Sequence, residues 1–241
     1  MWQQTNLEGI ELDLFEPQQL CGDGAIIYLH GHGGERLSEN QEFTRLFEEA
    51  QLPVVAPRGG RSWWLDVPSS EFPHELTPVQ FIKTKVVEEI QRRWGIEPPA
   101  IALLGVSMGG QGVLNIACRD GKRFPCVAAL SPAIDFHDIY GRGFEIEDMF
   151  SSREEARQHT VTLNLHPLNW PKHQFFASDP QDHQWHPGAE RLASKLSSSG
   201  ILHTADLTTS WGGHGWLYFN AQAEKAITFL KESLQNVNSA Y

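Results

Sequence analysis

The feature that most constrains this chain is a short apolar run that ends in a glycine-flanked serine. Ala100–Leu104 (AIALL) has the length and composition of a strand covered on both faces. It leads directly into Gly105-Val106-Ser107-Met108-Gly109, a G-x-S-x-G motif, and a helix is predicted over Met108–Arg119. Strand, sharp turn and helix in this order are typical of a nucleophile elbow, in which small residues allow the turn that presents the serine hydroxyl above the sheet.

The motif alone is a moderate signal, because small residues recur by chance. In the alternative interpretation Ser107 is an ordinary helix N-cap and the glycines serve only packing. The buried strand before the serine and the helix after it favour the elbow. We therefore expect Ser107 to be a nucleophile.

Short apolar runs alternate with helical patterns along the rest of the chain. Further strands are predicted at Ala25–Leu29, Pro53–Ala56, Cys126–Leu130, Gln174–Ala177 and about Leu202–Leu207. Further helices are predicted from Ser38, over Val79–Trp94, near Pro187–Ser197 and over about Ala221–Leu234. This alternation predicts an α/β fold with helices on both faces of a mostly parallel sheet.

The chain shows no internal repeat or linker, so we expect one domain over residues 1–241. Residues 132–171 are irregular and charged, and we interpret them as an insertion over one edge of the sheet that is too short for a large lid domain. Two helix starts have capping-box spacing, Ser38 with Gln41 and Thr77 with Gln80. Gly95 is expected to end the helix that Thr77 begins.

A serine hydroxyl is a weak nucleophile and needs a base within hydrogen-bond reach. In a fold of this kind the base comes last in the chain, on the loop after the final strand. His214 lies there, within Trp211-Gly212-Gly213-His214-Gly215-Trp216. It is one of 11 histidines, so its position in the chain selects it. In the alternative interpretation it is an ordinary surface histidine.

The third member of such a site is an acid after the penultimate strand. Asp179 and Asp182 both follow the strand that ends at Ala177. We prefer Asp182, which lies further along the loop and can reach back towards the imidazole, whereas Asp179 precedes a proline and resembles a turn residue. Asp135, after the strand that ends at Leu130, is a further candidate. Nucleophile, acid and base then follow in the order Ser107, Asp182, His214.

A tetrahedral intermediate needs preorganised donors for its negative charge. One is expected to be the backbone amide of Met108, directly after the nucleophile. The second should come from the turn His30-Gly31-His32-Gly33-Gly34, where we assign the His32 amide, with Gly33 as the alternative. This turn lacks the residues of a phosphate loop, and no helix carries histidines at i and i+4. We therefore expect no metal and no cofactor.

Eight tryptophans is a high number for this length. Trp63, Trp64, Trp211 and Trp216 are predicted on loops that surround the elbow, because sites in such sheets lie beyond the carboxyl ends of the strands. Aromatic walls suit an apolar or aromatic group of a substrate, although such residues also pack loops. Arg58 and Arg61 are candidates to meet a substrate carboxylate or to lie on the surface.

Composition excludes several other classes. The formal net charge is −11, with 19 Lys+Arg against 30 Asp+Glu and no basic run, so nucleic acid and anionic membranes are poor partners. No apolar stretch is long enough to span a bilayer, and residues 1–11 lack the pattern of a signal peptide. The cysteines (Cys21, Cys118, Cys126) lack metal or redox spacing, which favours free thiols and a cytoplasmic location.

Together these residues resemble the α/β-hydrolase superfamily, and within it the esterase D/S-formylglutathione hydrolase-like esterases. The resemblance covers about residues 25 to 235. It rests on Ser107-Met108-Gly109-Gly110-Gln111-Gly112, Phe124…Ser131-Pro132, Gly213-His214-Gly215-Trp216-Leu217-Tyr218-Phe219 and the loop Gly60–Asp66. Only about 24 residues precede the first core strand, so the family's N-terminal antiparallel strands should be trimmed. The His-Gly-His-Gly-Gly turn is more similar to the corresponding turn of general carboxylesterases and acyl-protein thioesterases than to that of formylglutathione hydrolases.

The resemblance implies a serine esterase that forms an acyl-enzyme and acts on small or aromatic carboxylic esters. A thioesterase or acyltransferase could use the same residues. A catalytically silent hydrolase-fold binding protein is the alternative from another class, although such a scaffold usually loses one of the three side chains. The expected partner is a small-molecule ester, and the sequence does not predict an oligomeric state.

Overall fold

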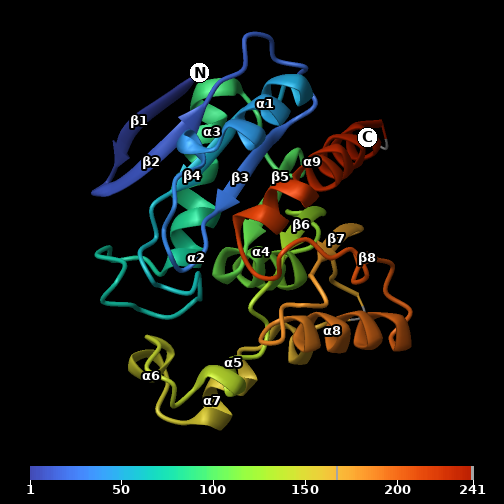
Figure 1. The fold of residues 1–241 in the computed structure, drawn as a ribbon. Coiled ribbons are helices and arrows are strands. Elements are labelled where there is room, and N and C mark those ends of the chain that lie inside the picture. The colour runs from blue at the N-terminus through green and yellow to red at the C-terminus, as the bar shows by residue number, and fades with distance from the viewer. Residues whose placement is uncertain (167, 240–241) are drawn as a thin grey trace.

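The computed structural model describes residues 1–166 and 168–239, in which eight strands form one sheet (Figure 1). The strands are β1 (Trp2–Leu7), β2 (Ile10–Phe15), β3 (Ala25–Leu29), β4 (Val54–Pro57), β5 (Ile101–Val106), β6 (Cys126–Leu130), β7 (His173–Ala177) and β8 (Thr204–Asp206). Their spatial order is β1-β2-β4-β3-β5-β6-β7-β8. The strands from β3 to β8 pair in parallel, and β2 is antiparallel to both of its neighbours.

The helices lie on the two faces of this sheet and at one end of it. They are α1 (Gln41–Ala50), α2 (Pro78–Phe81), α3 (Val87–Trp94), α4 (Met108–Arg119), α5 (Phe136–Ile139), α6 (Ile146–Met149), α7 (Arg153–Gln158), α8 (His186–Ser198) and α9 (Trp216–Ser239). A π-helical segment, Ile82–Val86, joins α2 to α3. None of the helices in the described residues is long and apolar enough to cross a membrane.

Side chains of each central strand alternate between two apolar cores. On β5, Ile101 and Leu103 pack in the core that contains the buried side chains of α3, α4 and α8. Ala102 and Leu104 pack in the other core, with α1 and α9, which lie on the near side of the sheet in Figure 1. This alternation follows from the two-residue period of a strand. The predicted mostly parallel sheet with helices on both faces is therefore confirmed.

Strands β1 and β2 form an antiparallel hairpin that was not predicted from the sequence. Glu8 and Gly9 make the two-residue turn, with φ angles of 50° and 93°, and the Gly9 amide donates to Asn6 Oδ1 at 2.9 Å. A turn this short uses little chain, so two strands fit ahead of β3. The expectation that the N-terminal antiparallel strands are trimmed is therefore wrong.

Of the two predicted capping-box helix starts, one is wrong and one is confirmed. Helix α1 begins at Gln41 rather than Ser38, because Asn40 is the N-cap and its side chain accepts from the Phe43 amide at 3.0 Å. Ser38 lies instead in a 3₁₀ turn, Leu37–Glu39. Thr77 and Gln80 form the predicted capping box.

The insertion at 132–171 contains α5, α6, α7 and a 3₁₀ turn, Val161–Leu163. Its Glu145 contacts the loops that leave the carboxyl ends of β3 and β4. It therefore lies beyond the ends of the strands, at the bottom of Figure 1, and the expectation that it covers a sheet edge is wrong. The last helix also starts earlier than predicted, so Trp216 is its first residue and is not on a loop.

Candidate active site

Ser107 stands in a strained backbone turn between β5 and α4. Its φ and ψ angles are 54° and −118°, a conformation that L-residues rarely adopt. Neighbouring backbone requires glycine on both sides: a Cβ on Gly105 would lie 2.3 Å from the Gly109 carbonyl oxygen, and one on Gly109 would lie 1.9 Å from that of Leu29. The glycines of the G-x-S-x-G motif are thus explained by steric crowding at the turn, as expected for an elbow.

The structure brings Ser107, His214 and Asp182 into one hydrogen-bonded line. Ser107 Oγ lies 2.9 Å from His214 Nε2, and His214 Nδ1 lies 2.6 Å from Asp182 Oδ2. Asp182 is buried and its Oδ1 also accepts from the Trp185 amide at 3.1 Å. The His214 side chain keeps 30% of its surface exposed. An imidazole in this position can take a proton from the hydroxyl while the carboxylate orients the ring.

Asp179 has a different set of partners from Asp182. Its fully buried carboxylate accepts hydrogen bonds from the amides of Gln181, Trp211 and Gly213 and from the Ser210 hydroxyl. Burial raises the pKa of Asp179, but these donors outweigh it, so the pKa lies below its ordinary value. Asp179 therefore holds the backbone of the loop that carries His214, a role that its place before a proline did not indicate.

Asp135, the other acid considered, is engaged elsewhere. Its Oδ2 accepts from Arg191 Nη2 of α8 at 2.5 Å, in a contact that joins the start of α5 to α8. Its other neighbours in α8 include Gly188, where a Cβ would lie 2.5 Å from Asp135 Oδ2. This carboxylate faces α8, and the His214 ring has Asp182 as its acidic partner.

The two backbone amides assigned to the oxyanion belong to the two segments that adjoin Ser107, the start of α4 and the turn after β3. Met108 is the first residue of α4, so its amide is among those of a first helical turn that lack an intrahelical partner. The turn after β3 lies against Ser107, because a Cβ on Gly31 would lie 3.4 Å from Ser107 Cβ. His32 follows directly in that turn.

His30 holds the start of this turn. Its Nε2 accepts from the Gly59 amide at 3.0 Å, and its Nδ1 lies 2.7 Å from the Gly31 carbonyl oxygen. Burial lowers the pKa of His30 to about 4, so the ring is neutral at pH 7. His30 thus connects the turn after β3 to the loop after β4 as an uncharged residue.

Glu145 connects the insertion to the same region, and no motif in the sequence pointed to it. Its Oε2 lies 2.9 Å from His32 Nε2 and accepts from Trp63 Nε1 at 3.3 Å, while its Oε1 accepts from Arg61 at 3.3 Å. Burial raises the pKa of Glu145, but its hydrogen bonds lower it further, so the net shift is downward. One carboxylate thus ties three segments together beside the assigned oxyanion turn.

The four tryptophans differ in what they offer a substrate. Trp63 and Trp64 are 1% and 0% exposed. Trp64 packs against Gly59 and Gly112 and donates to the His30 carbonyl at 3.0 Å, which does not favour a place in a substrate pocket. The Trp63 ring lies 5.8 Å from Phe136 and Phe144 and 5.9 Å from His32, in an aromatic cluster beside the turn.

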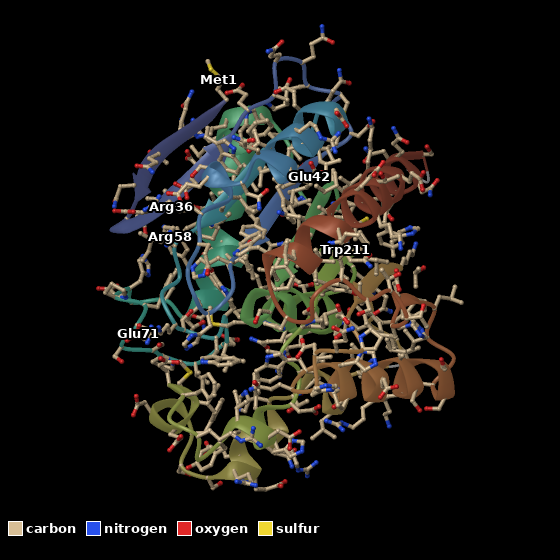
Figure 2. All side chains as sticks on the ribbon, in the orientation of Figure 1. Met1, Arg36, Glu42, Arg58, Glu71 and Trp211 are labelled. Atoms are coloured by element: carbon tan, nitrogen blue, oxygen red, sulfur yellow. The ribbon has the colours of Figure 1, made fainter. Side chains whose placement is uncertain are left out.

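Trp216 is half-buried in α9, where its ring contacts Phe43 and Phe219, whereas Trp211 is 61% exposed. Figure 2 shows Trp211 beside the start of α9.

Arg58, a candidate to bind a substrate carboxylate, already has a hydrogen-bond partner within the protein, since it donates to the Gly34 carbonyl at 2.5 Å. Among the described residues, no group of three or more His, Cys, Asp or Glu side chains could hold a metal ion.

A sheet of this strand order, with a strained serine at the turn between β5 and α4, defines the α/β-hydrolase fold class. The sequence model of the family described as "Esterase: Putative esterase" matches residues 15–228. The chain belongs to this esterase family and is a carboxylic ester hydrolase. A comparison with curated proteins finds no match.

Solved structures share the fold. Fluorophosphonate-binding serine hydrolase F (FphF) of Staphylococcus aureus is 17% identical, with 96% of each chain covered and a TM-score of 0.77. A ferulic acid esterase is 14% identical, with 96% of this chain and 97% of that chain covered and a TM-score of 0.74. An S-formylglutathione hydrolase from Agrobacterium tumefaciens is 15% identical, with 97% and 94% covered and a TM-score of 0.73. At these identities the likeness concerns the fold alone.

Proposed function

We propose that this esterase hydrolyses small or aromatic carboxylic esters through an acyl-enzyme on Ser107. The observation that carries the proposal is the continuous hydrogen-bonded line from Asp182 through His214 to Ser107. His214 Nε2 takes the hydroxyl proton as Ser107 Oγ attacks the ester carbonyl, and Asp182 orients the ring and stabilises the imidazolium. The proton then passes to the oxygen of the leaving alcohol. Water activated by His214 releases the acid in the second half of the reaction.

The amides of Met108 and His32 are proposed to stabilise the oxyanion in both steps. Their support is the position of Met108 at the start of α4 and the approach of the β3 turn to Ser107. Removing one such donor typically costs about 10²–10³ in kcat. The half-buried Phe144 ring, whose centroid lies 5.5 Å from that of the His32 ring, supports a substrate with a small or aromatic acyl group.

We further infer that residues 1–241 form one catalytic domain, which the eight-stranded sheet of the described residues supports. The three cysteines are free, as expected in a reducing compartment, and this favours the cytoplasm.

Hydrolysis of p-nitrophenyl acetate by the wild type and by Ser107→Ala tests the nucleophile. We expect turnover in the wild type and none above background in the variant, and equal rates would overturn the assignment. A fluorophosphonate should label the wild type only at Ser107, and failure to label it would favour a silent scaffold. Adding alcohol or thiol acceptors would reveal a transferase if acyl transfer outran hydrolysis.

A further inference from the structure

Two exposed apolar side chains lie on either side of His214 in the chain. Trp211 is 61% exposed and Leu217 is 70% exposed. Leu217 lies over the turn next to Trp211, because a Cβ on Gly212 would be 3.4 Å from Leu217 Cδ1. Figure 2 labels Trp211 on the loop that enters α9, and Leu217 is the second residue of that helix. The two side chains therefore border the same turn at the surface.

The surface around this turn carries no formal charge from its own segment. Between Asp206 and Glu224 the sequence contains no Asp, Glu, Lys or Arg, although the chain has 30 acidic residues. The Asp206 carboxylate is occupied by Thr209, Gln222 and Lys225. Asp179 is buried beneath the loop. An uncharged group would meet an apolar surface here, whereas a charged group would find no counter-ion in this segment.

The proposed mechanism determines which part of an ester comes to this surface. When the tetrahedral intermediate collapses, His214 Nε2 gives its proton to the alcohol oxygen, so that oxygen must come within hydrogen-bond reach of the ring. Asp182 occupies the Nδ1 side of the His214 ring. The buried Phe219 ring packs against the same imidazole at nearly a right angle, with 5.5 Å between the two ring centroids. The alcohol therefore approaches over the exposed part of His214.

We propose that Trp211 and Leu217 form the binding subsite for the alcohol part of the ester, and that this alcohol is an uncharged alkyl or aryl alcohol. The proposal rests on the proposed function. During acylation the bond from Ser107 Oγ to the acyl carbon forms and the bond from that carbon to the alcohol oxygen breaks. The serine proton leaves with the alcohol through His214 Nε2. A longer or aromatic alcohol gains contact with the two side chains while this occurs.

Acetate esters of different alcohols test the subsite, with hydrolysis followed by pH-stat. We expect the wild-type kcat/KM to rise from ethyl acetate to hexyl and benzyl acetate. In Trp211→Ser/Leu217→Ser the hexyl-to-ethyl ratio of kcat/KM should fall about ten-fold, since a few methylenes of apolar contact are worth this much. Leu202→Ser is the matched control: Leu202 is 71% exposed but precedes β8, at the opposite end of the strands from Ser107. It should leave the ratio unchanged.

Every acetate ester gives the same acetyl-enzyme, from which the alcohol has already left. The rate at which this acetyl-enzyme is hydrolysed should therefore be the same in Trp211→Ser/Leu217→Ser as in the wild type. An unchanged hexyl-to-ethyl ratio would overturn the subsite, and so would an equal loss for all alcohols, which indicates a displaced His214. A loss that follows acyl length, measured with ethyl acetate and ethyl hexanoate, would also overturn it. Hydrolysis by Ser107→Ala would instead contradict the proposed function. Failure of the proposed function is thus measured in a different variant from failure of the subsite.

Discussion

Asp179 and Asp182 leave the same turn after β7, yet only the Asp182 carboxylate reaches the His214 ring. Asp182 Oδ2 lies 2.6 Å from His214 Nδ1. Asp179 Oδ2 accepts from the amides of Trp211 and Gly213, so it holds the loop that carries the ring. Both carboxylates are buried, and their partners separate one role from the other.

Asp182→Asn should lower kcat for p-nitrophenyl acetate by a factor on the order of 10⁴, because an amide does not hold the imidazole in the required tautomer. The melting temperature should change little, since the oxygen of the new side-chain amide can still accept from the Trp185 amide and the imidazole can accept from the new N–H in its other tautomer. A loss of less than ten-fold would contradict the role of Asp182 as the acid.

Asp179→Asn should reduce both stability and activity. The amide group would place an N–H against one of the loop amides, and an unpaired buried donor costs about 1–3 kcal/mol. We expect a lower free energy of unfolding in urea and a kcat reduced about 10²-fold through displacement of His214. If Asp179→Asn lost as much activity as Asp182→Asn with unchanged stability, Asp179 would be the acid instead.

Glu145→Ala should lower kcat about ten-fold through the turn after β3. The substitution removes the acceptor shared by His32, Trp63 and Arg61, so the assigned oxyanion amide loses its support from the insertion. Steady-state kinetics on p-nitrophenyl acetate measures the effect. Glu147→Ala is the matched control, because Glu147 accepts from the Gly143 amide within the insertion. Equal activity of the two variants would show that the insertion does not act on this turn.

The buried His30 should make the fold sensitive to acid. Its pKa falls from 6.5 to about 4 on folding, so between these values the unfolded chain binds a proton that the folded chain does not. Stability is therefore fully present above pH 6.5 and decreases as pH falls towards 4, by roughly 3 kcal/mol.

The check is the free energy of unfolding in urea at pH 7 and pH 4, for the wild type and for His30→Gln. The wild type should lose roughly 3 kcal/mol more than the variant over this range. The same loss in both proteins would show that other groups cause the acid sensitivity.

Three elements whose sequence patterns lie within a short stretch of chain were predicted correctly. The helix over Met108–Arg119, the strand Cys126–Leu130 and the capping box at Thr77 were predicted with the bounds or contacts observed. The hairpin at Glu8 and Gly9 was missed, although its two-residue turn and the apolar alternation after it are local signals too. The helix start predicted at Ser38 was wrong because Asn40, two residues later, supplies the N-cap.

The sequence by itself determined the elbow, the alternation that makes a mostly parallel sheet, and the chain order that singles out Ser107 and His214. Only the tertiary structure decided which aspartate contacts His214, that Trp64 is buried while Trp211 is exposed, and that Glu145 joins the insertion to the turn after β3. The physical reason is that backbone preferences act between neighbours in the chain. The role of a carboxylate or an indole depends on the donors and surfaces that folding brings to it from distant segments.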